Sequence, residues 1–352
     1  MSSLGRTNSS SESVAECERV RFSVGEIAMM NPISTLFSAA LILVSLHVAE
    51  AQTQATTSRI GVLYLGAPNV NVDVFIQRLR ELGHIEGKNI TIEYRFAQGK
   101  EDRLPDLATE LVGLKVNAIF TAGTPAIFAL KRATKTIPII FFGTSDPVGT
   151  GAVASLAHPG GNITGITTQA SDLWPKRLEL LKEIFPKLSR VAMLWNKGNA
   201  GMALEARATQ EVAEPLALTV QDRGVKDPNE LDTVFAVMTK DRPDGFLALM
   251  DPVLNSYRKR IIDFLAQNRL PAMFENSDWV EAGGLISYGP SFPAAFRRAA
   301  VLMDKVLKGT TPTEIPVEQA RNFELVINLK TAKQIGLTIP PNVLARADRV
   351  IK

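Results

Sequence analysis

The segment Arg59-Ile60-Gly61-Val62-Leu63-Tyr64-Leu65-Gly66 is the strongest indication of the fold of this chain. It is a continuous apolar run of strand length, which predicts a strand that is covered on both faces. A helix is expected at 70–82, and 89–95 then alternates apolar and polar residues, which predicts a second, more exposed strand. A strand, a helix and a further strand in this order form the unit from which parallel sheets are built.

Repetition of this pattern extends the first unit. The next expected elements are a helix with Leu104, Leu107, Leu111 and Leu114 on one face, a strand at 117–122, a helix at 124–134 and a strand at 137–142. Leucines spaced three or four residues apart share one side of a helix, so these four predict the face that packs on the sheet. Four strands joined by right-handed crossover helices form one parallel sheet.

The pattern restarts after residue 162 and predicts a second unit. Its expected strands lie at 163–167, 190–195, 216–221, 245–250 and 271–274, and its expected helices begin at Asp172 or lie at 200–213, 228–239 and 255–267. The fold class that we expect is therefore α/β with two parallel sheets. Because ligands of such folds bind beyond the carboxyl ends of the strands, two units place a cleft between their loops.

An apolar stretch at 33–48, followed by Ala49-Glu50-Ala51, indicates export. Small residues at the third and first positions before a cleavage point are typical of a secretory signal, so we expect residues 1–51 to be a leader and signal peptide and the mature chain to begin at Gln52. An uncleaved membrane anchor is the alternative, but the stretch is shorter than the ~20 residues that a helix needs to span a bilayer. The sequence therefore predicts a periplasmic protein.

Composition limits the classes of partner. The 352 residues include 39 Lys and Arg and 36 Asp and Glu, which gives a net charge of +3. Because no run of basic residues interleaved with aromatic ones occurs, nucleic-acid binding is not indicated. About 300 residues follow the leader, and this is the length of two domains of ~150 residues.

Few residues are available for metal or nucleophile chemistry. The single cysteine, Cys17, lies in the leader, and only His84 and His158 follow the leader. Clustered metal ligands and Cys/His or Ser/His pairs need more such residues, so we expect no metal site and no cofactor. We interpret both histidines as surface loop residues. Signatures of a nucleophile elbow and of a phosphate-binding loop are also missing, which argues against an enzyme.

Six segments of the chain carry a resemblance to a known family. They are Gly123-Thr124-Pro125-Ala126, Ser145-Asp146-Pro147-Val148-Gly149-Thr150-Gly151, Leu156-Ala157-His158-Pro159-Gly160-Gly161-Asn162-Ile163-Thr164-Gly165, Lys176-Arg177-Leu178-Glu179-Leu180-Leu181, Val191-Ala192-Met193-Leu194-Trp195-Asn196 and Glu324-Leu325-Val326-Ile327-Asn328-Leu329-Lys330-Thr331-Ala332. Together they resemble the substrate-binding proteins of ABC importers, in particular the tryptophan/tyrosine-binding group. The resemblance extends over essentially all of 59–352.

The resemblance implies a type I periplasmic binding fold, in which two Rossmann-like lobes close on a small molecule. It also implies a monomeric protein without enzymatic activity, which captures a small polar solute such as an amino acid and delivers it to an ABC permease in the inner membrane. Two alternatives stay open at this point. They are an exported α/β-fold enzyme such as a hydrolase, and a partner of a sensor ectodomain.

Such a fold requires the chain to cross between its lobes more than once. We expect crossings near 164–168, near 284–289 and after 308–312, where glycines beside short strands allow backbone rotation. The first lobe then comprises 59–165 and 285–312, and the second comprises 166–284 and 313–352.

Candidate ligand contacts lie in the loops that leave strand ends. They are Gly66, Thr124, Pro125, Ser145, Asp146, Asn196, Asp251 and Tyr288. Thr124 and Pro125 open a helix whose free amides suit a carboxylate, and plain helix capping explains them equally well. Asn196 is also typical of a turn, and the rings of Tyr288 and Tyr64 either face the ligand or belong to the core.

Asp146 and Asp251 are placed alike, each after an expected strand and before a proline. As helix caps they would serve stability alone. Our hypothesis is that at least one of the two carboxylates faces the cleft and pairs with a cationic group, such as an α-ammonium, through a charge-assisted hydrogen bond.

Overall fold

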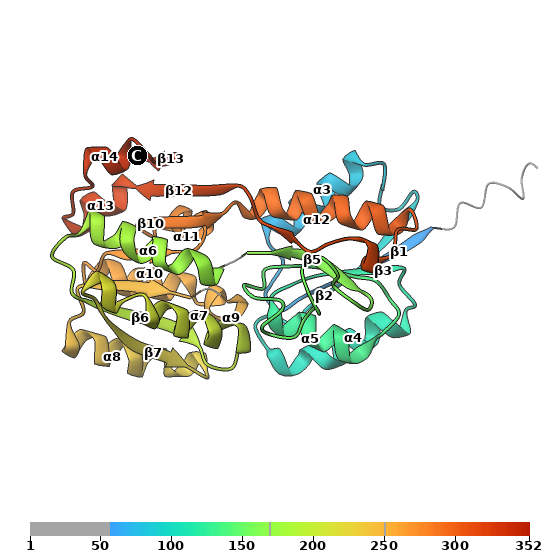
Figure 1. The fold of residues 1–352 in the computed structure, drawn as a ribbon, viewed down its shortest axis with the longest axis horizontal. Helices are drawn as coiled ribbons and strands as arrows, with labels where there is room; N and C mark the ends of the chain where they lie inside the picture. The colour runs from blue at the N-terminus through green and yellow to red at the C-terminus, as the bar shows by residue number, and fades with distance from the viewer. Residues whose placement is uncertain (1–56, 169, 250) are drawn as a thin grey trace, which may run out of the picture. The chain divides into compact units, whose positions relative to one another are not determined.

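The computed structural model describes residues 57–168, 170–249 and 251–352 (Figure 1). The expected leader, with its cleavage point after Ala51, lies outside these residues. Export of the chain therefore stays a prediction. Among the described residues, no helix combines the length and the apolar character that a membrane span requires.

A six-stranded parallel sheet forms the first lobe. In spatial order its strands are β11 (Glu318–Gln319), β5 (Ile163–Thr167), β4 (Ile139–Phe142), β3 (Ala118–Ala122), β1 (Ser58–Tyr64) and β2 (Ile90–Phe96). β1 pairs with β2 and β3 and is largely buried, which agrees with its continuous apolar run. β2 is an edge strand and is partly exposed, which agrees with its alternating pattern.

Helices cover both faces of this sheet. The helical elements of the first lobe are α3 (Val70–Glu81), η2 (Glu101–Arg103), α4 (Leu104–Gly113), α5 (Thr124–Ala133), α12 (Phe292–Leu307) and η5 (Pro312–Glu314). α3 and α12 lie side by side on one face (Figure 1), where Phe75 stacks on Phe120 with 4.1 Å between the ring centroids. α4 and α5 cover the other face through buried residues such as Leu107, Leu111 and Ile127.

A seven-stranded sheet forms the second lobe. In spatial order its strands are β13 (Arg349–Ile351), β12 (Phe323–Asn328), β10 (Ile286–Pro290), β9 (Ala272–Phe274), β8 (Gly245–Ala248), β6 (Arg190–Asn196) and β7 (Thr219–Val225). β12 runs antiparallel to β10, and the other neighbours pair in parallel. The expected α/β class with two parallel-dominated sheets is confirmed.

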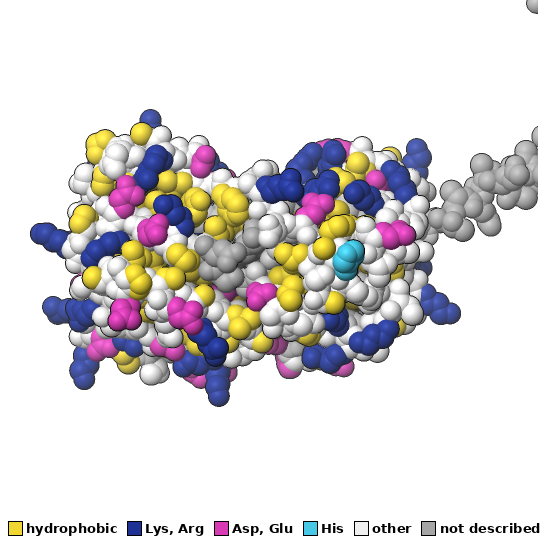
Figure 2. All heavy atoms as spheres, in the orientation of Figure 1, with side chains coloured by type: hydrophobic (Ala, Val, Ile, Leu, Met, Phe, Trp, Pro, Cys, Tyr) yellow, Lys and Arg dark blue, Asp and Glu magenta, His cyan; other side chains and the backbone are white. Residues whose placement is uncertain are grey.

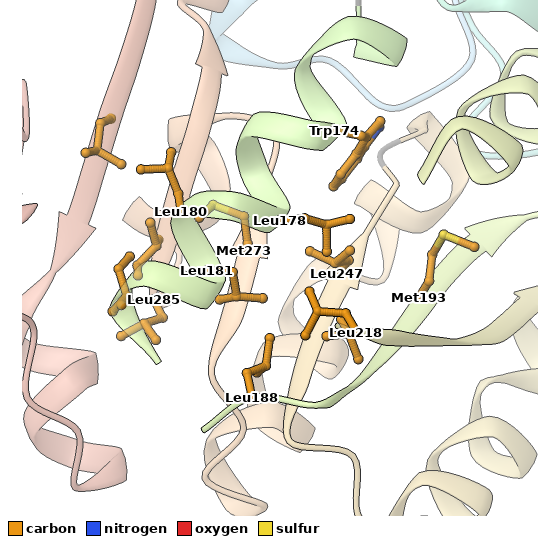
Figure 3. Packing of buried hydrophobic residues seen from close by; sticks show 14 of the residues in the cluster. Trp174, Leu178, Leu180, Leu181, Leu188, Met193, Leu218, Leu247, Met273 and Leu285 are labelled. Atoms are coloured by element: carbon orange, nitrogen blue, oxygen red, sulfur yellow. The ribbon is translucent and has the colours of Figure 1, made fainter. Parts of the chain in front are cut away.

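Helices also pack on both faces of the second sheet. They are α6 (Ala170–Ile184), α7 (Ala200–Glu211), η3 (Glu214–Leu216), η4 (Pro228–Glu230), α8 (Leu231–Asp241), α9 (Pro252–Ser256), α10 (Arg258–Gln267), α11 (Ser277–Glu281), α13 (Leu329–Ile335) and α14 (Pro341–Leu344). Figure 3 shows Leu178 and Leu181 of α6 packed over Leu247 of β8 and Met273 of β9. The apolar side of α6 therefore faces the sheet.

Strand pairing places the first crossing where it was expected and the other two later in the chain. β10 pairs with β9 and β12, so the expected assignment of 285–290 to the first lobe is wrong. β11 pairs with β5, so 313–319 belong with the first sheet rather than with the second. β5 itself pairs with β4 and ends the first unit instead of starting the second. The chain therefore leaves one sheet for the other after β5, after β10 and after β11.

Candidate functional site

A cavity of about 530 Å³ lies where the two lobes meet. The first lobe contributes Tyr64, Pro68, Asn69, Val70, Asn71, Ala122, Gly123, Phe142, Gly143, Phe292 and Phe296, and the second contributes Met202, Glu205, Asp251, Pro252, Asn255, Arg258, Glu275, Asn276, Asp278, Glu281 and Ala282, with Thr168 at the crossing. Tyr64, Gly123 and Gly143 mark the carboxyl ends of β1, β3 and β4. The cavity therefore lies where α/β folds bind ligands, and its volume is that of a small-molecule site.

Aromatic rings form much of the first-lobe wall. Phe142, at the end of β4, meets the edges of Phe292 and Phe296 with centroid separations of 4.9 and 5.1 Å. Burial, assisted by the negative charge of Asp278, raises the pKa of Tyr64 to about 12. The Tyr64 hydroxyl is therefore neutral and able to donate a hydrogen bond. This wall suits a flat apolar or aromatic group.

The second-lobe wall is acidic. Figure 2 shows basic and acidic side chains interspersed over the visible face of the protein. By contrast, the ionisable side chains that line this wall are Glu205, Asp251, Glu275, Asp278, Glu281 and Arg258. An excess of carboxylates in a partly enclosed space favours a cationic group on a bound molecule.

A buried cluster of polar groups supports this wall. The Arg177 side chain of α6 is fully buried, and its Nε donates to the carbonyl oxygen of Tyr288 at 2.7 Å. Its guanidinium carbon lies 4.3 Å from the centre of the Trp174 ring, and its Nη2 lies 3.9 Å from Glu275 Oε1. Trp174 Nε1 in turn donates to Glu205 Oε2 at 2.9 Å. Arg177 and Trp174 therefore position two of the carboxylates that line the cavity.

Burial raises the pKa of Glu205 and that of Glu275. For Glu205, desolvation acts together with the charge of Glu275, and the pKa rises to about 8 although the hydrogen bond from Trp174 and the charge of Arg177 oppose the rise. For Glu275, burial raises the pKa and the charge of Arg177 lowers it. A cation bound beside these groups would favour their ionised forms.

Asn71 links the two lobes at the cavity wall. It lies in the first turn of α3, where its N–H donates to the side chain of the helix cap, Asn69, at 3.0 Å. Its Nδ2 donates to Asp278 Oδ2 of α11 at 3.0 Å. Its Oδ1 is buried and has no hydrogen-bond partner within the described residues. Because an unpaired buried acceptor costs free energy, this oxygen is a natural partner for a donor on a bound molecule.

Of the residues predicted to contact a ligand, Asp251 lines the cavity. Its Oδ1 accepts the N–H of Leu254 at 2.9 Å and caps α9, so the capping interpretation is confirmed. Its Oδ2 accepts Nδ2 of Asn196 at 2.5 Å. Asn196, at the end of β6, thus lies beside Asp251 but outside the lining of the cavity. Contact between either residue and a ligand stays a prediction.

Thr124 and Pro125 line a separate crevice of about 220 Å³, together with Glu101 and Asn199. Gly123, directly before them, lines the main cavity. The beginning of α5 therefore lies at both openings, but the predicted side chains face the smaller one.

Gly66 and Ser145 lie close to the main cavity without lining it. A side chain at Gly66 would meet the ring of Tyr64, so glycine there leaves room for that ring. Ser145 is buried and belongs to the surroundings of Glu205, where its hydroxyl favours the ionised carboxylate.

Asp146 and Tyr288 serve the structure in other ways. Asp146 Oδ1 accepts the N–H of Gly149 at 2.7 Å, so the carboxylate closes a turn, and no helix begins there. The ring of Tyr288 lies against Phe323 with 6.4 Å between centroids, and its carbonyl oxygen receives the bond from Arg177. Neither side chain lines the cavity.

The two histidines differ from one another. His158 is exposed in a loop, as expected. His84 is only partly exposed, and its Nε2 lies 2.7 Å from Asp304 Oδ1 of α12. Within the described residues, no group of three or more His, Cys, Asp and Glu side chains is arranged to hold a metal ion.

Sequence reasoning missed most of the acidic wall. Glu275 directly follows β9, so its place at a strand end was a usable signal, although no proline follows it as one follows Asp251. Arg258 opens α10 without any distinctive neighbour. Glu205 lies in the middle of α7, where a glutamate is ordinary, and only burial against Trp174 distinguishes it.

Comparison with known proteins places this geometry in a family. The profile of the family described as "ABC transporter substrate binding protein" matches residues 67–351. A tyrosine-binding protein of Clostridioides difficile (strain R20291) is 27% identical over 263 residues, which cover 75% of each of the two chains.

Two solved structures of related sequence give a further comparison. The crystal structure of an ABC domain from Streptococcus pneumonia in complex with L-Trp is 26% identical, with a TM-score of 0.77 over 84% of this chain and 100% of that one. The ligand-free, open structure of a substrate-binding protein with adhesive properties from Clostridium difficile is 25% identical, with a TM-score of 0.61 over 84% of this chain and 99% of that one.

Proposed function

This chain belongs to the ABC transporter substrate-binding protein family, and from this premise we propose that its cavity captures a free amino acid with an aromatic side chain. Proteins of this family bind small solutes and work with ABC transporter permeases. The relative that is named for tyrosine binding and the related structure that holds L-Trp support this class of ligand.

The observation that carries the proposal is the division of the cavity wall. The rings of Tyr64, Phe142 and Phe292 lie in the first lobe, whereas Glu205 and Asp278 lie in the second. An aromatic side chain placed against the rings directs the α-ammonium of the same molecule toward the carboxylates. Such ammonium–carboxylate hydrogen bonds are the strong kind, because both partners are charged.

Arg258 supplies the partner for the α-carboxylate. It lines the cavity, and its Nη1 donates to the backbone oxygen of Asp278 at 3.2 Å. A guanidinium has five N–H donors, so others are available to a bound anion. The buried Oδ1 of Asn71 adds an acceptor for an N–H or O–H of the ligand.

We also propose that the lobes close around the ligand. The higher TM-score to the L-Trp complex than to the ligand-free, open structure, at nearly equal identity, supports a closed arrangement of this chain. A ligand that contacts both lobes shifts the equilibrium toward the closed state, because it binds that state more tightly.

The remaining parts of the proposal concern the setting of the protein. We propose that it is exported through cleavage after Ala51, that it acts as a monomer in the periplasm, and that it releases its ligand unchanged to a permease of the inner membrane. Mass spectrometry of the ligand after incubation tests the last point, and conversion of the amino acid to a product would favour the exported-enzyme alternative.

A calorimetric titration with matched ligands tests the division of the wall. L-Trp, L-Tyr and L-Phe should bind, and indole-3-propionate, which lacks the ammonium, should bind about 10- to 150-fold more weakly than L-Trp. Tryptamine tests the Arg258 contact in the same way, and L-Leu tests the rings. Equal affinity for indole-3-propionate and L-Trp would show that the acidic wall does not hold the ammonium.

A further inference from the structure

A second contact between the lobes lies outside the main cavity. Thr124 opens α5 of the first lobe, and Gly201 lies in the first turn of α7 of the second. A Cβ atom at Gly201 would lie 2.8 Å from Thr124 Oγ1, which is closer than such atoms approach in proteins. The backbone of Gly201 is helical, so alanine suits its conformation. A larger residue at this position would therefore force the Thr124 side chain or the lobes themselves to shift.

Beside this contact, one amide group holds two carboxylates. Asn196 Nδ2 donates to Asp251 Oδ2 at 2.5 Å and to Glu101 Oε1 at 3.3 Å. Asn196 and Asp251 belong to the second lobe and Glu101 to the first. Carboxylates that share one amide nitrogen lie next to each other, and their negative charges repel most strongly where water is excluded.

The surroundings of Glu101 do not compensate its charge. Arg132 lines the same crevice, but within the described residues no cation is among the groups that shift the pKa of Glu101. Burial and the charge of Asp251 raise the pKa of Glu101, while the hydrogen bond from Asn196 lowers it. Ionised Glu101 is therefore less favourable in this arrangement than it would be in water.

We infer that this second contact between the lobes sets how readily they close. The missing side chain of Gly201 permits closure, and the repulsion between Glu101 and Asp251 opposes it. Glu101, Thr124 and Gly201 are positioning residues, since none of them lines the main cavity. The inference rests on the lobe closure proposed above. Because the two carboxylates repel each other in the closed state, the lobes close only when a bound ligand favours closure, and they open readily to release it.

Substitutions on the two sides of the contact should act in opposite directions. The apparent dissociation constant rises as the population of the binding-competent state falls. Gly201→Ala should raise the dissociation constant about tenfold, because overpacking penalises the closed state. Glu101→Gln keeps the shape and removes the charge, so it should lower the constant about threefold.

Matched variants control for effects on folding. Asp102→Asn removes an exposed carboxylate beside Glu101, and Gly113→Ala adds a methyl group to a helical glycine with nothing within 4 Å of the new atom. Both should leave the affinity unchanged. Thr124→Ala removes the hydroxyl that the added Cβ would meet, so Gly201→Ala combined with Thr124→Ala should bind within about twofold of Thr124→Ala alone.

Measuring a distance between the two lobes tests closure directly, both without ligand and with it. Spin labels at Arg80→Cys on α3 and Lys240→Cys on α8 report on the two lobes, and Cys17→Ser in the same full-length chain leaves no other cysteine. Double electron–electron resonance on the ligand-free protein and with L-Trp should show more of the long distance in Gly201→Ala and more of the short distance in Glu101→Gln.

Failure of this inference differs from failure of the proposed ligand. If L-Trp does not bind the unsubstituted protein, the amino-acid proposal fails, and the ligand-free distances still decide the role of the crevice. Unchanged distances in both variants, with melting temperatures like that of the parent, would overturn the inference. It would also be overturned if Thr124→Ala failed to rescue Gly201→Ala.

Discussion

The two walls of the cavity are built on different principles. The rings of the first lobe, such as Phe142 and Phe296, are stabilised by burial of apolar surface and need no specific partner. The carboxylates of the second lobe cost free energy when they are buried, so they depend on groups such as Arg177 and Trp174 that lie behind them. The acidic wall therefore depends on residues deep in its lobe, whereas the aromatic wall depends only on contacts among its own rings.

The largest loss of stability is expected for a substitution of Arg177, behind the acidic wall. Arg177→Ala leaves Glu205 and Glu275 buried without their cation, and removing one partner of a buried charge cluster costs about 3–5 kcal/mol. Urea denaturation measures the free energy of unfolding. The neighbouring Lys176 pairs with Glu179 at the surface, so Lys176→Ala should change stability by less than about 0.5 kcal/mol. Equal effects at both positions would remove the distinction between a buried network and a surface pair.

The acidic wall should also give the ligand-free protein a particular pH dependence. Glu205 ionises near pH 8 in the folded chain and near 4.5 when exposed, so the folded state binds more protons between these values. The free energy of unfolding should therefore fall as pH rises from about 4.5 to 8, by up to about 1.4 kcal/mol per pH unit, and level off above this range.

Two glutamine variants of α7 check this assignment. Glu205→Gln should flatten the slope in thermal or urea unfolding at several pH values. Glu211→Gln, an exposed position on the same helix, should preserve it. A slope that persists in Glu205→Gln would assign the titration to other groups and weaken the contrast between the walls.

The smallest effect on stability is expected in the aromatic wall. Phe142→Leu keeps an apolar side chain and loses edge contacts to Phe292 and Phe296, which should cost less than about 1.5 kcal/mol. Affinity for L-Phe should fall more than affinity for L-Leu, because only the aromatic ligand loses a ring partner. Phe185→Leu, outside the cavity, is the calorimetric control. Equal losses for the two ligands would show that the ring packs the lobe without contacting the ligand.

Much of the fold could be predicted because it depends on local periodicity. The apolar run of β1 predicted a buried strand and the alternation of β2 a more exposed one, and β2 indeed lies at the edge of the sheet. The sheet to which β11 belongs could not be predicted, because a strand of two residues shows no periodicity. Its pairing with β5 depends on the direction of the chain after η5, which packs against β5. The expected helix at 255–267 is two helices because Asp251 and Pro252 start a separate turn.

The candidate site was predictable only in part. Asp146 and Asp251 share one local pattern, yet Asp146 closes a turn with Gly149 and Asp251 lies at the cavity. The pattern fixes the position of each residue at a strand end. It does not fix which side of the loop faces the other lobe, because that depends on the packing of distant elements.

Periodicity and local motifs are enough to predict the order of strands and helices, the two α/β units and the family. Which side chains meet at the cavity depends instead on how distant segments pack together. Asn71 and Asp278, which are 207 residues apart in the chain, are hydrogen-bonded to each other. Glu205 has a raised pKa only because the fold buries it beside Trp174 and Arg177. Desolvation and hydrogen bonding between remote segments give these groups their properties, and neither is encoded in the spacing of neighbouring residues.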